Sequence, residues 1–362
     1  MSTAMNKSVE AARVPEKSII SGYWDYPATI TVTNYQFKSL SDFVFNTAVG
    51  CLHGCTPCYV PGASANKQHE KLAERGVDDP DEQWGQYALL RVWDEKRFLS
   101  SLKTAENMAS EDLKPEGHRA IMFCSTTDPY QTIRNADPKL GTEYTKHHQE
   151  MVRRALELIR DRSTLNVRIL TRSPLAKTDF ELFKSFGNRL AFGMSLPTLN
   201  DAVSKAYEPG APGVKKRLAT LKAAKDAGLH VYVAMAPTYP ECDEADLRAT
   251  MKAIAALEPI TVFHEPLNIR ADNIERIRKH GEEEEIKPNL SPFETTDAWR
   301  KYSWEHFQLI EKIATEVGMS HCLHLWPDQD MATRAYLQSL PDPTGFVEWL
   351  QKWWTRISEW PE

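Results

Sequence analysis

Short apolar runs alternate with amphipathic stretches through the middle of the chain, and this alternation is the strongest constraint on its fold. Six runs suit strands, at 42–46, 119–125, 166–171, 189–196, 230–237 and 260–265. Helical periodicity follows at 93–105, 143–160, 178–186, 213–227 and 245–257. Continuous apolar runs are typical of strands covered on both faces. The sequence therefore predicts an α/β fold with repeated strand–helix units around a parallel sheet.

The flanking regions lack this alternation. Residues 1–41 are expected to form an irregular or extended N-terminal leader, and the polar segment 60–87 a long functional loop or lid. After position 269 the pattern predicts a helix at 297–317, a short strand at 321–326 and a Trp-rich helix at 346–360. We therefore divide the chain into a leader (1–41), a core (42–273) and a mainly helical C-terminal extension (274–362) that closes the open side of the core.

Charge and hydropathy narrow the choice of partners. The 362 residues carry 44 Lys and Arg against 50 Asp and Glu, a formal net charge of −6, so no chain-wide basic field attracts nucleic acid. Nucleic acid is a possible but not a favoured partner. Neither a signal-peptide core nor a stretch of about 18 apolar residues occurs. These features predict a cytoplasmic protein with no membrane partner.

Three of the six cysteines, Cys51, Cys55 and Cys58, share one short loop after the first predicted strand. Gly50 and Gly54 let this loop turn tightly. Three thiolates can hold three corners of an iron–sulfur cubane and leave its fourth iron open to another ligand. A structural zinc site is the alternative, but it usually needs four protein ligands in paired knuckles. The spacing therefore favours iron–sulfur over zinc.

The Cys-x3-Cys-x2-Cys spacing in this position resembles the radical S-adenosylmethionine (SAM) superfamily. Later stretches are similar, in order, to its spore photoproduct lyase-like branch: CSTTDPYQ (124–131), ILTRSPL (169–175), GMSLPTLN (193–200), YEPGAP (207–212), RLATLKAAKDAGLHVYVAMAPTYP (217–240) and FHEPLNIRADN (263–273). The resemblance implies a partial (β/α)6 barrel with its site at the carboxyl ends of the strands. It also implies a [4Fe–4S] cluster on the three cysteines, with SAM as the ligand of the fourth iron.

The resemblance further implies contacts to SAM near the strand ends. These residues are Ser125, Thr126 and Thr127, then Arg172 and Ser173, and finally Ser195 toward the ribose. Because Pro57 occupies the position where the superfamily usually has an aromatic residue, either Tyr59 packs on the adenine or that contact is weaker.

Three positions have two readings each. Asp128 either contacts a ligand or caps a turn, and Arg172 either binds the SAM carboxylate or pairs with Glu208. The resemblance implies that Cys124 is a hydrogen donor to a product radical, and the alternative is a small buried apolar side chain.

At the end of the sixth strand, the polar side chains are expected to recognise substrate or SAM rather than to pack. They are Glu265, Asn268 and Arg270.

The resulting hypothesis is a radical SAM enzyme that cleaves SAM to a 5′-deoxyadenosyl radical and abstracts hydrogen from an unidentified organic substrate. It would need a one-electron reductant such as flavodoxin or ferredoxin. Repair of a DNA photoproduct is conceivable within this class, but the net charge of −6 weighs against it. Two alternatives are a non-enzymatic iron–sulfur or zinc protein that binds a partner, and an inactive barrel that binds SAM only.

Overall fold

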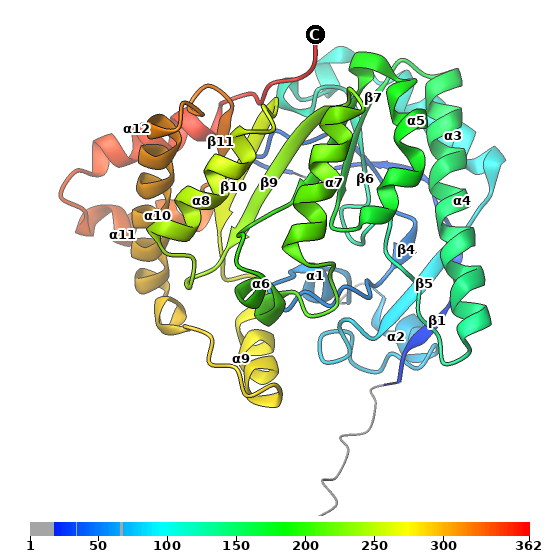
Figure 1. The fold of residues 1–362 in the computed structure, drawn as a ribbon, viewed down its shortest axis with the longest axis horizontal. Helices are drawn as coiled ribbons and strands as arrows, with labels where there is room; N and C mark the ends of the chain where they lie inside the picture. The colour runs from blue at the N-terminus through cyan, green and yellow to red at the C-terminus, as the bar shows by residue number, and fades with distance from the viewer. Residues whose placement is uncertain (1–17, 34, 66–67) are drawn as a thin grey trace, which may run out of the picture.

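An eight-stranded sheet forms the centre of the molecule (Figure 1), as seen in a computed structural model that describes residues 18–33, 35–65 and 68–362. Its order is β11-β10-β9-β8-β7-β6-β3-β2, and every neighbouring pair is parallel except β2 with β3. The strands are β2 (Ile30–Val32), β3 (Phe43–Phe45), β6 (Ala120–Phe123), β7 (Asn166–Thr171), β8 (Leu190–Ser195), β9 (His230–Thr238), β10 (Thr261–Pro266) and β11 (Leu323–Leu325). Because β2 and β11 remain edges, the sheet is a partial barrel, and all six predicted core strands are confirmed.

Helices cover the outer face of this sheet (Figure 1). They are α3 (Glu95–Glu106), α4 (Pro138–Arg162), α5 (Phe180–Lys184), α7 (Val214–Asp226), α8 (Glu244–Ala255) and α10 (Thr296–Glu316). The side chains of Asp94, Asp137 and Asp243 cap the N-termini of α3, α4 and α8. All five helices predicted between strands are present, although a 3-10 turn at Pro174–Asp179 precedes α5 and shortens it.

The first part of the chain is more ordered than the sequence predicts. β1 (Ile20–Pro27) pairs with β5 (Tyr87–Val92), which also pairs with β4 (Ala48–Val49), and together they form a second, three-stranded sheet. The expected irregular or extended leader is extended at residues 20–27 and 30–32, where β1 and β2 join the two sheets, while residues 1–17 lie outside the described part. β4 has only two residues, and β1 is half-exposed and finds its partner far along the chain, so a local pattern does not reveal these two strands.

The segment 60–87 also differs from the expected loop. It contains α1 (Val60–Ala65) and α2 (His69–Ala73), each too short to show helical periodicity. Leu72, Val77 and Trp84 are buried in a small core with Trp24 of β1. The segment is therefore a packed cover on the second sheet.

The C-terminal part is mainly helical, as predicted, and adds β11 to the sheet edge. Beside α10 it contains α9 (Asn273–Glu283), α11 (Arg334–Ser339) and α12 (Pro343–Trp354); α9, α11 and the short α6 (Asp201–Tyr207) were not expected from the sequence. The last predicted helix ends at Trp354, and the remaining residues form an irregular tail. The domain divisions at 41/42 and 273/274 stay predictions. None of the helices in the described ranges has the length and apolar character that crossing a bilayer demands.

Candidate functional site

A cavity of about 660 Å³ opens where β6 to β10 end, on the same side of the molecule as α1 and α9. Most of the side chains singled out in the sequence line it. They are Cys51, Cys55, Cys58, Tyr59, Cys124, Ser125, Thr126, Thr127, Asp128, Arg172, Ser195, Glu265, Asn268 and Arg270. Ser173 and Glu208 are buried and do not line the cavity. The topology thus brings side chains from five strand ends to the cysteine loop.

The cysteine loop owes its shape to close backbone contacts. Gly50 and Gly54 have positive φ angles of 87° and 56°. At Gly54 the loop crosses Gly85 so closely that a Cβ on Gly54 would lie 2.9 Å from the Cα of Gly85. Thr56 N–H donates to the carbonyl of Tyr207 at 2.8 Å, and His53 C=O accepts from Gly210 N–H at 3.0 Å. The cysteine loop can therefore pass this close to the neighbouring chain only because both residues at the crossing, Gly54 and Gly85, are glycines.

All six cysteines are free, so three thiols are available on this loop. Burial raises the pKa of Cys51, Cys55 and Cys58, to about 12 for Cys55, so the thiolates require a bound metal to form near pH 7. In residues 18–33, 35–65 and 68–362, no three Cys, His, Asp or Glu side chains lie close enough together to bind a single metal ion. A zinc ion would need sulfur ligands about 2.3 Å from one point, whereas each cysteine of a cubane binds its own iron. The donor set thus fits a cluster.

Asp128 holds the ends of β6 and β7 together. Its Oδ1 accepts from Thr171 Oγ1 at 2.7 Å and from Tyr130 N–H at 2.8 Å, and its Oδ2 accepts from Arg172 N–H at 2.8 Å. His53 Nδ1 lies 3.5 Å from the same Oδ2. The carboxylate lines the cavity but is occupied by backbone and side-chain donors, which matches the capping reading of this residue.

Arg172 pairs with Glu208, the second of its two readings. Its Nε lies 2.6 Å from Glu208 Oε1, while the buried Arg217 lies 2.6 Å from Glu208 Oε2. Burial acts to raise the pKa of Glu208, but the charges of Arg217 and Arg172 together lower it to about 2. Glu208 therefore anchors Arg172, whose side chain is 23% exposed at the cavity wall.

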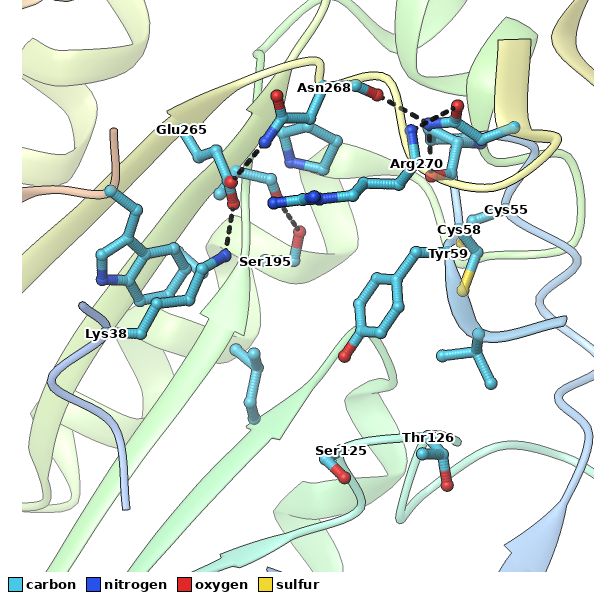
Figure 2. A pocket seen from close by; sticks show the side chains of 18 of the residues that line it. Lys38, Cys55, Cys58, Tyr59, Ser125, Thr126, Ser195, Glu265, Asn268 and Arg270 are labelled. Atoms are coloured by element: carbon cyan, nitrogen blue, oxygen red, sulfur yellow. Dashed lines mark hydrogen bonds and ion pairs between the residues drawn. The ribbon is translucent and has the colours of Figure 1, made fainter. Parts of the chain in front are cut away.

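The hydroxyl groups at the strand ends divide into two sets. Thr127 donates to the carbonyl of Gly50 at 2.7 Å, and Ser173 caps the 3-10 turn that precedes α5, so both serve the local backbone. Ser195 donates to the carbonyl of Ala236 at 3.1 Å, while Ser125 accepts a long bond of 3.4 Å from Asn46 and also contacts the hydroxyl of Tyr35. Ser125 and Ser195 flank the middle of the cavity in Figure 2. They retain the hydrogen-bonding capacity that a ligand needs.

Cys124 lies at the cavity wall in a left-handed conformation, with φ 63°. Its Sγ is 3.2 Å from Thr47 Oγ1, which is 2.6 Å from His148 Nε2. Burial raises the pKa of the Cys124 thiol to about 12. The group is therefore a protonated thiol near neutral pH, held by a two-residue hydrogen-bond chain that the sequence pattern does not reveal.

A polar network covers the wall opposite the cysteines. Lys38 Nζ lies 2.8 Å from Glu265 Oε2, and Asn268 Nδ2 donates to Glu265 Oε1 at 2.9 Å. Asn268 also donates to Asp328, which pairs with Arg270. Figure 2 shows the ring of Tyr59 projecting into the space between Cys58 and the Lys38–Glu265 pair. The three residues predicted at the sixth strand thus belong to one network.

Sequence reasoning missed three members of this wall. Lys38 lies in the segment expected to be irregular, and Trp326 and Asp328 follow β11 in the extension. Lys38 Nζ sits 4.6 Å from the centre of the Trp326 ring. The pairing of β10 with β11, which are distant in sequence, brings Trp326 and Asp328 to the site.

Comparisons with known proteins agree with this architecture. A family model described as the Radical SAM superfamily matches residues 45–254. An uncharacterized protein of Acidianus two-tailed virus is 30% identical over 66% of this chain and 72% of its own length. An uncharacterized protein of Methanocaldococcus jannaschii is 24% identical over 85% of this chain and 96% of its own length.

Solved structures of spore photoproduct lyase share the fold. A variant in complex with dinucleoside spore photoproduct superimposes with a TM-score of 0.58 at 13% identity, covering 85% of this chain and 81% of the lyase. Another, with bound AdoMet and the same dinucleoside, gives 0.55 at 14% identity over 84% and 80%. Since the family model spans more than half of its length, this chain belongs to the radical SAM superfamily, whose enzymes use a [4Fe–4S] cluster and S-adenosylmethionine.

Proposed function

We propose that this enzyme cleaves SAM reductively in the cavity and abstracts a hydrogen atom from an organic substrate. The substrate would lie against the wall opposite the cysteines, which carries Lys38, Glu265 and Asn268. The observation that carries the proposal is the set of three free thiols, Cys51, Cys55 and Cys58, facing the same cavity as the polar strand ends. These three cysteines would hold the cluster. When bound, it supplies the electron that converts SAM to methionine and a 5′-deoxyadenosyl radical, and a one-electron donor such as flavodoxin or ferredoxin would replace that electron.

The residues of the chain have separate parts in this proposal. Tyr59 would pack on the adenine, and Ser195 with Ser125 and Thr126 would bind polar groups of SAM, because all four line the cavity between the cysteines and the opposite wall. Glu208 holds Arg172 through its Nε, and the terminal nitrogens of Arg172 would bind the SAM carboxylate, so both readings of this residue apply in the proposal. Asp128, Thr127 and Ser173 would not bind SAM themselves. They would hold the strand ends, and so the SAM-binding side chains, in position.

Cys124 is the candidate hydrogen donor. Its thiol stays protonated near neutral pH because burial raises its pKa to about 12, and a protonated thiol can give up a hydrogen atom. Glu265, Asn268 and Arg270 would contact the substrate. The cations at this cavity, Lys38, Arg172 and Arg270, are each paired with a carboxylate, which makes a phosphodiester substrate, and with it DNA photoproduct repair, the less favoured choice.

The test uses anaerobically reconstituted protein. Iron and sulfide are measured first, and 5′-deoxyadenosine is then followed after addition of SAM and dithionite. We expect about four irons per chain and deoxyadenosine formation, both lost in Cys58→Ala. Cys322→Ala removes a buried cysteine outside the cavity and should retain both. Zinc in place of iron, or an intact cluster that never cleaves SAM under reduction, would refute the proposal.

A further inference from the structure

Two side chains of α9 form hydrogen bonds to the backbone of the cysteine loop. Three consecutive carbonyls of the loop, those of Thr56, Pro57 and Cys58, each accept a hydrogen bond from the first turns of α9. Arg276 Nε donates to Thr56 O at 2.9 Å and its second terminal nitrogen donates to Cys58 O, while Asn273 Nδ2 donates to Pro57 O at 3.3 Å. One helix thus holds the backbone on both sides of Pro57.

The same guanidinium also forms an ion pair. Its remaining terminal nitrogen bonds to Asp81, in the segment between α2 and β5. Arg276 is 11% and Asp81 24% exposed, so both charges are partly shielded from water next to the Cys58 backbone. One helical turn further along α9, Lys279 pairs with Glu82. The α9 helix therefore connects the cysteine loop to the packed cover, and the charge nearest the loop is balanced by one carboxylate.

We propose that Arg276 is a positioning residue of the cluster loop, and that its charge, balanced by Asp81, tunes the reduction potential of the cluster. This inference rests on the proposed function, because it requires that Cys58 binds iron. Reduction adds a negative charge to the cluster, and a nearby guanidinium stabilises the reduced form. A nearby carboxylate has the opposite effect. The two partners of one ion pair therefore pull the potential in opposite directions.

The test is an EPR-monitored redox titration of reconstituted protein, together with its iron content. Arg276→Gln should shift the midpoint potential to more negative values, because it removes the cation and leaves Asp81 unpaired. Asp81→Asn should shift it to more positive values, because Arg276 then lacks its counterion. The double variant should return toward the wild-type potential, since both charges are gone.

Two further variants separate charge from shape. Arg276→Lys keeps the charge but cannot reach two carbonyls and a carboxylate at once, so iron content should fall while the remaining cluster keeps a potential near that of the wild type. Arg278→Gln is the matched control on the same helix, because Arg278 is 52% exposed and pairs only with Glu275 among the contacts described. It should change neither quantity.

The possible results distinguish a failure of this inference from a failure of the proposed function. If Arg276→Gln and Asp81→Asn both keep the wild-type potential while Cys58→Ala loses its iron, Arg276 has no such part and the cluster assignment stands. If Arg276→Gln holds no cluster, an Asp81→Asn potential equal to that of the wild type still overturns the inference. If Cys58→Ala retains a full cluster, the proposed function itself fails.

Discussion

Glu208 is the residue that holds the side chain of Arg172 in place at the cavity wall. Its side chain is fully buried, with one oxygen bonded to Arg172 and the other to Arg217. A buried charge pair adds little net stability compared with apolar residues, but removal of one partner leaves the others uncompensated. The geometry therefore predicts a large effect from the loss of this single carboxylate.

We expect Glu208→Gln to lower the free energy of unfolding by about 3 kcal/mol at pH 7. The charges of Arg217 and Arg172 override the effect of burial and lower the pKa of Glu208 to about 2. The stabilisation is therefore complete above the ordinary pKa of a glutamate and is lost as the pH falls toward 2. Urea unfolding at several pH values should show the difference between wild type and variant narrowing below about pH 4.3. A difference that is constant with pH would contradict this assignment.

A suitable control is Glu95→Gln, which breaks an exposed ion pair with Arg154 on the outer helices. Exposed pairs of this kind contribute little to stability. The control should therefore unfold close to the wild type at every pH.

At the scale of elements, the apolar periodicity of the sequence predicted the long helices and the buried strands. The core strands and the helices α4, α7, α8 and α10 show clear apolar patterns because one face, or both, is covered. Most of the elements that were missed are short, such as α6 and α11, or depend on a distant partner, such as β1 on β5; α9, with 11 residues, is an exception. Local spacing was enough to find the cysteine loop, and the resemblance to the radical SAM superfamily pointed to the strand-end residues. It could not find Lys38 or Arg276, because only tertiary packing brings them to the site.

The crossing of the cysteine loop over Gly85 makes an element-scale prediction. Gly85 has φ 89°, and a Cβ there would lie 2.7 Å from the Cα of Gly54. Gly85→Ala should therefore destabilise the protein by about 2 kcal/mol and reduce the iron content on reconstitution, since the loop must shift. Thermal unfolding and iron analysis measure the two effects.

Gly228→Ala isolates the backbone-strain part of that effect. Gly228 has a similar φ of 81°, but a Cβ there would meet no atom within 4 Å. It should show the backbone strain without the loss of iron. Equal iron content in the two variants would show that the crossing does not constrain the loop.

At the scale of the whole molecule, buried histidines connect the C-terminal extension to the sheet. His306 of α10 stacks on His264 of β10 with ring centres 5.3 Å apart, and its Nε2 lies 2.8 Å from Thr238 Oγ1. His324 of β11 contacts the carbonyl of Arg356 in the tail at 2.8 Å. Protonation of these rings would place charges inside the packing between extension and core. The extension therefore makes stability sensitive to pH.

Burial lowers the pKa of His148, His306 and His324 to about 4 each. The unfolded chain binds protons at these rings below about pH 6.5, whereas the folded chain does not until about pH 4. Stability should therefore fall as the pH drops from 6.5 toward 4, by up to about 1.4 kcal/mol per pH unit for each ring. Urea unfolding between pH 7 and 5 measures this slope, and His306→Gln should reduce it by the contribution of one proton. Glu208→Gln should keep the slope, because that carboxyl titrates at lower pH, and a flat wild-type profile from pH 7 to 5 would refute the assignment.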